Sequence, residues 1–403
     1  MYKKYKTSLL LTQCSNVTIR ILGIEKSEKL IYDLGRYLTR SKIMQMNIPT
    51  GYRNFLISHN DIEFFKSQKT ADQVKKINQI KDNFDLCIVS GWDAATIAYL
   101  SGLKYIIFFM GDDIKIPPFV KNSKPDFLNE PVNKYNFLQR KFYKHILNNA
   151  LACVTGSEEM ISYLKKYRKD AYRIDGFVAN TSLFNPTVKP IDLKKNTFTF
   201  FSPQRIGLEK GTDVLWKAIS LCKSDFEVIQ VEWFDEKSPE AKRTSNELLK
   251  IKPSKVRLIP LIKLVDMPKY YAFADAVLGE MKTGHLNYTE CEAILCKKPV
   301  ITYNDPKWKH LAAGKEISSP FLPTSQDPLQ IAELIDKVVE SRDFREKLIE
   351  TEYDFIMKMA DPVKKAEEWD DFFEIVYKQQ KSTKKNIPFF IRWFRMIFFY
   401  ICQ

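Results

Sequence analysis

The sequence lacks the residue patterns from which metal sites and disulfide frameworks are built. Its seven cysteines are scattered and odd in number, and they include no CxxC pair and no Cys/His cluster. The four histidines are not spaced as metal ligands are. We therefore predict neither a metal site nor structural disulfides, and a reducing, cytoplasmic environment fits the chain best.

Long apolar runs are also missing. The leucines at 9–11 form too short a run for the apolar core of a secretory signal, and the polar Gln13 and Asn16 follow at once. No stretch approaches the roughly 20 apolar residues that span a bilayer. No repeat of solenoid period is visible either. We predict that the protein does not cross a membrane.

Positive charge, in contrast, is abundant. Among 403 residues, 63 are basic and 49 acidic, which gives a formal net charge of +14. Such a charge favours a nucleic acid, an anionic membrane or a phosphorylated small molecule as partner. The chain has no RRM, KH or zinc-finger pattern, and outside the C-terminal tail its basic residues are interspersed with acidic ones. We therefore expect no nucleic-acid partner, and nucleic-acid binding remains the weakest of the alternatives.

Short apolar segments alternate with helical patterns in both halves of the chain, which predicts an α/β protein with two doubly wound parallel sheets. In such sheets, ligands bind outside the carboxyl ends of the strands. The strands are expected at residues 17–22, 86–90, 105–110, 151–155 and 171–174, and again at 197–201, 226–231, 256–259, 276–278 and 299–302. The predicted units are a first domain at 1–188, a second at 196–361, a closing helix at 362–380 and a tail at 381–403.

A short basic loop follows the first strand of the second half. Arg205 and Lys210 lie five residues apart, Gly211 permits a sharp turn, and Thr212 or Asp213 is expected to cap a helix. Unpaired N–H groups and the positive end of the helix dipole attract anions, and the two cations add charge. The loop predicts a phosphate site. The alternative is that both cations are simply solvated.

A second loop meets a helix N-terminus near residues 284–289. Backbone N–H groups there can face a pyrophosphate or sugar hydroxyls, and His285 can hydrogen-bond a sugar. Glu292, expected in the first turn of the helix, can accept hydrogen bonds from a vicinal diol, although a first-turn glutamate is also favoured by the helix dipole alone. The other candidate binding residues of this loop are Leu286, Asn287, Tyr288 and Thr289.

Two adjacent carboxylates, Asp112 and Asp113, follow the strand expected at 105–110. Such a pair invites a metal or general-base role, but adjacent loop carboxylates more often cap helices or face solvent. Contact with an acceptor substrate is a further alternative at this position.

The tail after Tyr377 contains no acidic residue. Residues 387–403 (IPFFIRWFRMIFFYICQ) are too short and too charged to span a bilayer, yet too apolar for a free soluble tail. Arg392 and Arg395 are expected on one helical face. We predict an interfacial helix on an anionic membrane surface. Packing against the protein itself or a partner subunit is the alternative. The basic residues of the tail are Lys378, Lys381, Lys384, Lys385, Arg392 and Arg395.

Several of these segments together resemble the GT-B glycosyltransferases, specifically the retaining family 4 group. The similar stretches are FFMGDDIK (108–115), YRIDGFVANTSLFNP (172–186), SPQRIGLEKGTDVLWKAI (202–219), VRLIPLIKLVDMPKYYAFADAVL (256–278) and GHLNYTECEAILCKKPVITY (284–303). They occur in the order that the family has.

The resemblance implies a GT-B fold and transfer of a sugar from a UDP-, GDP- or ADP-sugar to a glycan or lipid-linked acceptor. It further implies retention of the anomeric configuration, no metal and no cofactor. Arg205 and Lys210 are implied as the catalytic cations at the phosphates, with Gly211 beside them, and Glu292 as the ribose ligand. A protein attached to the cytoplasmic face of the membrane and serving polysaccharide synthesis fits this picture.

Among the positions that depart from the family pattern, two fall where the family contacts the reacting sugar. The first glutamate of its Glu-x7-Glu motif falls on Gly284, and the histidine of its HG-x-D loop falls on Met110. These losses leave open a GT-B sugar-nucleotide epimerase or a catalytically degenerate nucleotide-sugar-binding subunit.

Overall fold

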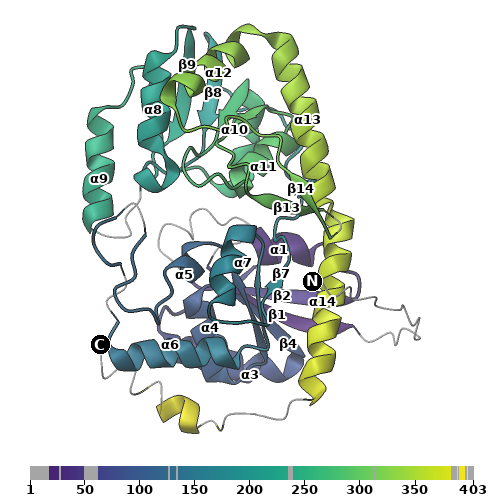
Figure 1. The fold of residues 1–403 in the computed structure, drawn as a ribbon. Coiled ribbons are helices and arrows are strands. Elements are labelled where there is room, and N and C mark those ends of the chain that lie inside the picture. Colours follow the sequence, from purple (N-terminus) through teal and green to yellow (C-terminus); the bar gives the residue numbers. More distant parts are fainter. Residues whose placement is uncertain are drawn as a thin grey trace, which may run out of the picture.

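The computed structural model describes residues 18–26, 29–49, 62–125, 128–132, 135–234, 239–312, 314–382, 388, 390–394 and 397. These residues form two α/β domains, one above the other in Figure 1, and each is built on a parallel sheet. The doubly wound α/β class predicted from strand–helix alternation is confirmed.

The N-terminal domain has a seven-stranded sheet in the order β3-β2-β1-β4-β5-β6-β7. Its strands are β1 (Ile19–Glu25), β2 (Ser41–Asn47), β3 (Glu63–Phe64), β4 (Leu86–Ser90), β5 (Tyr105–Phe109), β6 (Ala152–Thr155) and β7 (Tyr172–Arg173). Helices α3 (Thr70–Ile80), α4 (Trp92–Ser101), α6 (Phe137–Asn149) and α7 (Glu158–Lys165) pack on one face. Helix α1 (Lys29–Gly35) packs on the other, and the short α5 (Asp112–Lys115) follows β5.

The C-terminal domain has a five-stranded sheet in the order β10-β9-β8-β11-β12. Its strands are β8 (Phe198–Ser202), β9 (Phe226–Val231), β10 (Val256–Ile259), β11 (Ala276–Leu278) and β12 (Val300–Ile301). Helices α8 (Thr212–Leu221), α9 (Pro239–Lys250) and α12 (Pro328–Glu340) pack on one face. Helices α10 (Met267–Phe273), α11 (Tyr288–Leu295) and α13 (Arg342–Ala360) pack on the other.

A long C-terminal helix joins the two domains. Helix α14 (Pro362–Ser382) leaves the C-terminal domain and runs along the N-terminal one (Figure 1). Its buried Trp369, Phe372 and Phe373 pack into the face of the sheet that α1 also covers. Arg40 forms ion pairs with Asp371 at 2.7 Å and with another α14 carboxylate at 2.6 Å. Apolar burial and charge together hold α14 on the N-terminal domain.

Some elements differ from the sequence-based expectation. Helix α1 ends at Gly35, and a strand that the sequence did not predict, β2, begins at Ser41. Strand β2 was not predicted because its sequence contains no apolar run. It buries polar side chains such as Gln45 and Asn47 instead. The antiparallel hairpin of β13 (Lys309–Ala312) and β14 (Lys315–Ser318) was not predicted either, since its sequence is charged and partly exposed.

Part of the tail packs back on the protein. The Arg392 guanidinium lies against Gly102, and Trp393 contacts the apolar cluster beneath α4. Burial lowers the pKa of Arg392. Arg392 therefore does not lie on a lipid-facing surface, which corrects the expectation that it shares an anchoring face with Arg395. Phe390 and Phe394 remain exposed, and Arg395 with most of residues 381–403 lies outside the described residues.

Candidate active site

The basic loop after β8 is tightly built. Its 3-10 turn (Leu208–Lys210) ends at Gly211, which has φ of 67° and is the N-cap of α8. A Cβ at Gly211 would lie 2.7 Å from the carbonyl carbon of Met281, so this close approach and the left-handed φ both require glycine. Thr212 is already helical, and its hydroxyl accepts the Gly207 N–H at 3.0 Å. The predicted capping by Thr212 or Asp213 is therefore wrong, because the backbone turns one residue earlier.

Lys210 lies where several strand ends meet. Its Nζ is 3.1 Å from Glu280 Oε2 and 3.2 Å from Asn287 Oδ1. Glu280 follows β11, and Asn287 is the N-cap of α11. The cationic loop and the α11 N-terminus, predicted as anion sites from separate stretches, thus lie at one place. Lys210 is their meeting point.

Arg205 has a different environment on the same loop. Its Nε is 3.6 Å from Glu209 Oε1, and its guanidinium carbon lies 5.4 Å from the centre of the Trp233 ring. The side chain is 21% exposed, which leaves part of the guanidinium accessible to a ligand. The aromatic face and the carboxylate orient the planar fork.

The N-terminus of α11 is organised by a capping box between Asn287 and Glu290. Asn287 N–H donates to Glu290 Oε2 at 3.1 Å. The Thr289 hydroxyl accepts from Gln204 Nε2 at 2.6 Å. Tyr288 is half-buried, and burial of its hydroxyl raises the pKa of that group well above the usual value. Its ring packs on Phe177 of the N-terminal domain at 5.3 Å.

Glu292 is not in the first turn of α11, which corrects the prediction. The first-turn acidic residue is Glu290, and Glu292 follows two residues later as the fifth residue of the helix, 2% exposed. The hydroxyl of Tyr271 donates to Glu292 Oε2 at 3.1 Å. Burial raises the pKa of Tyr271 well above its usual value, so the phenol stays a donor. The ribose role of Glu292 stays a prediction.

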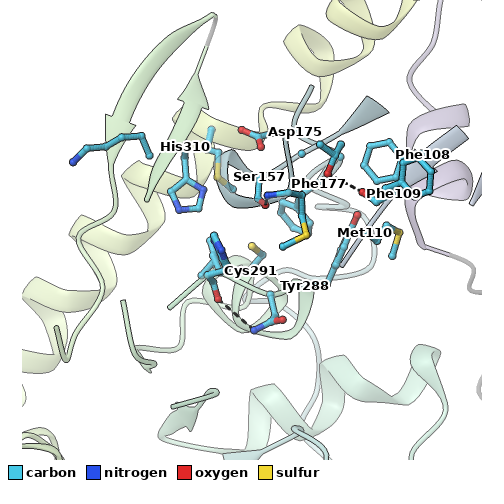
Figure 2. Close-up of a pocket in the computed structure, with 18 residues that line it drawn as sticks. Phe108, Phe109, Met110, Ser157, Asp175, Phe177, Tyr288, Cys291 and His310 are labelled. Atoms are coloured by element: carbon cyan, nitrogen blue, oxygen red, sulfur yellow. Dashed lines mark hydrogen bonds between the residues drawn. The ribbon is translucent and has the colours of Figure 1, made fainter. Parts of the chain in front are cut away.

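A cavity of about 130 Å³ lies between the domains, beside the α11 N-terminus. Figure 2 shows Met110, Ser157, Asp175 and Phe177 from the N-terminal domain facing residues of the C-terminal one. The C-terminal residues include His285, Leu286, Asn287, Tyr288 and His310. Burial lowers the pKa of His310 to about 4, so its imidazole is neutral at physiological pH. Ser157 caps α7 and accepts the Met160 N–H at 3.1 Å.

His285 reaches across to the N-terminal domain. Its Nε2 hydrogen-bonds Glu159 Oε2 at 2.7 Å, and its ring stacks on Trp308 at 4.8 Å. Lys115 Nζ lies 2.7 Å from the same Glu159 oxygen. Burial alone would raise the pKa of Glu159, but the hydrogen bonds from His285 and Lys115 outweigh it and lower the pKa. In this structure, the predicted sugar ligand His285 is thus engaged by a carboxylate.

The Asp113 carboxylate binds the local backbone. Asp113 lies within α5 and accepts the N–H groups of Gly111 at 3.0 Å and Met110 at 3.3 Å, which precede the helix. These bonds hold the loop after β5 against the start of α5. Asp112 begins α5, and its side chain lies outside the described residues.

The two departures from the family pattern have structural consequences. Gly284 has φ of 72°, and a Cβ there would lie 2.5 Å from Asp305 Cβ, so no glutamate fits at this position. Met110 is 42% exposed and lines the cavity with a thioether in place of an imidazole. The sequence alone showed the losses, but not that backbone geometry at 284 forbids any side chain.

Several residues of the site were not foreseen. Glu280 pairs with Lys210, and Gln204 donates to Glu290. Glu159 binds His285, and His310 lines the cavity between the domains. A carboxylate directly after a buried strand, as Glu280 is, was the available signal. The remaining residues could not be identified from the sequence, because their positions in the site depend on contacts between segments that are far apart in the chain. Within the described part of the chain, no three His, Cys, Asp or Glu side chains gather as a metal site. No helix there is long and apolar enough to cross a membrane.

Residues 185–355 match the family described as "Glycosyl transferases group 1". These residues make up most of the C-terminal domain, which is therefore similar to the group 1 glycosyl transferases. No curated protein matches the chain. The match covers the Lys210 loop, β11 and the whole of α11, whereas the N-terminal residues that line the cavity lie outside it.

Solved structures show the same fold over nearly the whole of this chain. HepE of Anabaena, in complex with UDP and glucose, is 17% identical with a TM-score of 0.63, over 88% of this chain and 99% of its own. Sucrose-phosphate synthase of Thermosynechococcus elongatus is 13% identical with a TM-score of 0.64, over 89% and 100%. A glycosyltransferase of Rickettsia africae is 17% identical with a TM-score of 0.60, over 90% and 99%.

Proposed function

We propose that this protein is a glycosyltransferase, which takes a hexose from a nucleoside-diphosphate sugar and transfers it to a glycan or lipid-linked acceptor. One observation carries the proposal. Lys210 Nζ lies 3.2 Å from the side chain that caps α11, so a cation and a helix N-terminus converge at the carboxyl ends of β8 and β11. A pyrophosphate is the anion that such a combination suits. The similarity of the C-terminal domain to the group 1 glycosyl transferases supports the transfer chemistry.

The chemistry requires stabilisation of the negative charge that grows on the β-phosphate as the sugar leaves. Lys210, Arg205 and the backbone near Thr289 supply preorganised positive potential there. Because these groups need no metal, we propose metal-independent transfer. We also propose retention, in which the departing phosphate helps to deprotonate the acceptor on the same face of the sugar. No protein nucleophile is then required.

UDP and UDP-sugars are the first ligands to test, since HepE was solved with UDP and with UDP-glucose. In this proposal Glu292 holds the ribose diol from its buried position on α11, and Leu286, Asn287 and Tyr288 line the sugar end of the pocket. GDP- and ADP-sugars complete the panel. We expect the transfer reaction to require no cofactor.

The experiment measures nucleoside-diphosphate release from UDP-, GDP- and ADP-sugars, with and without chelator, in the presence of glycan and lipid-linked acceptors. We expect one nucleotide to be used, the rate to survive chelation, and NMR to show the donor's anomeric configuration in the product. An inverted product contradicts the retaining mechanism. Loss of activity with EDTA contradicts metal independence.

A specific observation supports a second candidate. Position 284 excludes a carboxylate, and Met110 offers no strong hydrogen-bond donor to the sugar, so the usual contacts to the reacting ring are missing. A degenerate nucleotide-sugar-binding subunit, or an epimerase, needs fewer of these contacts. Tight UDP binding without transfer supports the subunit. A change of sugar configuration without acceptor supports the epimerase.

We further propose that the protein works attached to the cytoplasmic face of a membrane. Phe390, Phe394 and Ile397 are 70%, 62% and 44% exposed at spacings of four and three, so they share one helical face. An exposed apolar face beside a basic lead-in suits an anionic interface. The lysines at 384 and 385 lie outside the described residues.

Vesicle pelleting tests the attachment. We expect the full chain to sediment with anionic vesicles, and neither a chain ending at Ser382 nor the Phe390→Ser/Phe394→Ser variant to do so. Leu221→Ser changes an apolar residue of α8 that is 45% exposed and lies outside the tail, and it is the control. Equal sedimentation of all four proteins refutes the attachment.

A further inference from the structure

Three ionisable side chains lie together behind the proposed phosphate site. Glu280 and Glu290 are completely buried, and Lys210 is 17% exposed. Charged side chains are rarely buried unless they are paired and hydrogen-bonded. The transfer chemistry described above uses Lys210 but gives no role to either carboxylate. Their burial beside a catalytic cation therefore needs a reason.

Glu280 binds Lys210 and the following turn at the same time. Its Oε2 pairs with Lys210 Nζ at 3.1 Å. Its Oε1 accepts the Thr283 N–H at 2.9 Å and also the Thr283 hydroxyl. Because Glu280 is fully buried and both oxygens are engaged, it is placed to act on Lys210 and not on a ligand in the cleft.

Glu290 connects the strand ends around the same point. Its Oε1 accepts Gln204 Nε2 at 2.9 Å and the Glu280 N–H at 3.2 Å, which ties the loops after β8 and β11 together. The Thr302 hydroxyl, after β12, lies 3.4 Å from the same oxygen. Its Oε2 accepts the Asn287 N–H of α11. One carboxylate thus joins three strand ends to the helix N-terminus.

The electrostatics agree with this role. Burial raises the pKa of Glu290, and the charge of Glu280 raises it further, while Lys210 lowers it. The N–H donors that surround Glu290 favour an acceptor at this position. Asn287, which Glu290 orients through the capping box, is the second ligand of the Lys210 ammonium.

We propose that Glu280 and Glu290 are positioning residues, which hold the Lys210 ammonium at the α11 N-terminus before any donor arrives. Glu280 does so directly, and Glu290 does so through Asn287 and the β11 end. The inference rests on the proposed function, because a fixed ammonium matters for a transferred sugar only if Lys210 meets its phosphates. An ordered cation removes a reorganisation step from the reaction.

Lysine acylation tests the positioning without any ligand. Trace labelling with acetic anhydride, followed by mass spectrometry, compares Lys210 with the exposed Lys347 of α13 as internal reference. We expect Lys210 to be labelled slowly in the native protein and about tenfold faster, relative to Lys347, in Glu280→Gln. Glu352→Gln is the matched control, since Glu352 is another buried carboxylate, which accepts the Val300 N–H at 3.0 Å. It should leave Lys210 labelling unchanged.

Kinetics separate positioning from mere structural support. Glu280→Gln should lower kcat about tenfold without weakening UDP binding, because the variant loses alignment of Lys210 but also removes a negative charge near the phosphates. In a Lys210→Met background the same change should alter kcat less than twofold, since the residue acts through Lys210. Should Glu280→Gln not fold, Glu290→Gln is used, which disorders Asn287 and should also raise Lys210 labelling.

The outcomes distinguish this inference from the proposed function. Equal Lys210 labelling in native and variant proteins overturns the positioning role, whatever the enzyme transfers. If Tm and UDP affinity fall in parallel with kcat in the variant, the positioning role is also overturned, because such losses indicate loss of structure. If UDP, GDP and ADP all fail to protect Lys210 from acetylation while the variant still raises its labelling, the proposed function fails and the ammonium positioning stands.

Discussion

Replacing Lys210 by methionine probes the site most directly, because it removes one charge and keeps the length of the side chain. Lys210 Nζ lies 3.1 Å from the fully buried Glu280, so the variant leaves a buried carboxylate without its ion-pair partner. Breaking a buried pair from one side costs about 3–5 kcal/mol. Glu280 retains two donors from Thr283, and Lys210 is partly exposed, so we expect about 1–3 kcal/mol of lost stability.

The loss of activity should be larger. Truncating one partner of a desolvated charge pair costs about 2–5 kcal/mol, so kcat/KM should fall by about 30-fold to several thousand-fold. Urea unfolding gives the stability change, and release of nucleoside diphosphate gives kcat/KM. A folded Lys210→Met protein with kcat/KM within threefold of native refutes the role of Lys210.

A double variant separates the two effects. Lys210→Met/Glu280→Gln removes both charges, and replacing a buried pair by neutral groups is often nearly neutral for stability. We therefore expect the double variant to regain most of the lost stability and none of the lost activity. Recovery of activity together with stability would show that Lys210 contributes only to folding.

Three further predictions concern other parts of the molecule. Gly284→Glu should destabilise the protein by about 2–3 kcal/mol in urea unfolding and gain no activity, because φ of 72° and Asp305 exclude the side chain. Burial lowers the pKa of His310 to about 4, so the unfolded chain takes up this proton at a higher pH than the folded protein does. The free energy of unfolding should therefore fall as pH drops from about 6.5 towards 4, by at most about 3 kcal/mol. His310→Phe should reduce this pH dependence. Trp369→Ala should cost about 3–5 kcal/mol, measured by urea unfolding, since the ring is fully buried between α14 and the N-terminal sheet.

The alternation of apolar strands with helical patterns predicted both sheets because most strands buried in a parallel sheet are nearly continuous apolar runs. Strands β4, β9, β10 and β11 have the predicted bounds. Strand β2 could not be predicted in this way, since Gln45 and Asn47 are buried through contacts with the neighbouring strand end. Periodicity reports burial of apolar side chains only.

The candidate site was likewise predicted only in part from the sequence. Arg205, Lys210 and Gly211 were identified from the sequence because a cationic loop before a helix is a local feature. The partners of Lys210 are 70 and 77 residues away, and no local pattern pairs them with it. His285 was expected to face a sugar, yet its partner Glu159 lies 126 residues earlier, on the other domain.

The sequence by itself therefore determined the fold class, the prediction of an anion site at the Lys210 loop and the group of enzymes that the chain resembles, because each depends on residues close together in the chain. Only the tertiary structure decided which groups surround the ammonium, that Glu292 lies beyond the first turn of α11, and that backbone geometry rules out a side chain at Gly284. These features arise from the packing of β8, β11 and β12 around one helix end, which brings distant residues within hydrogen-bonding distance.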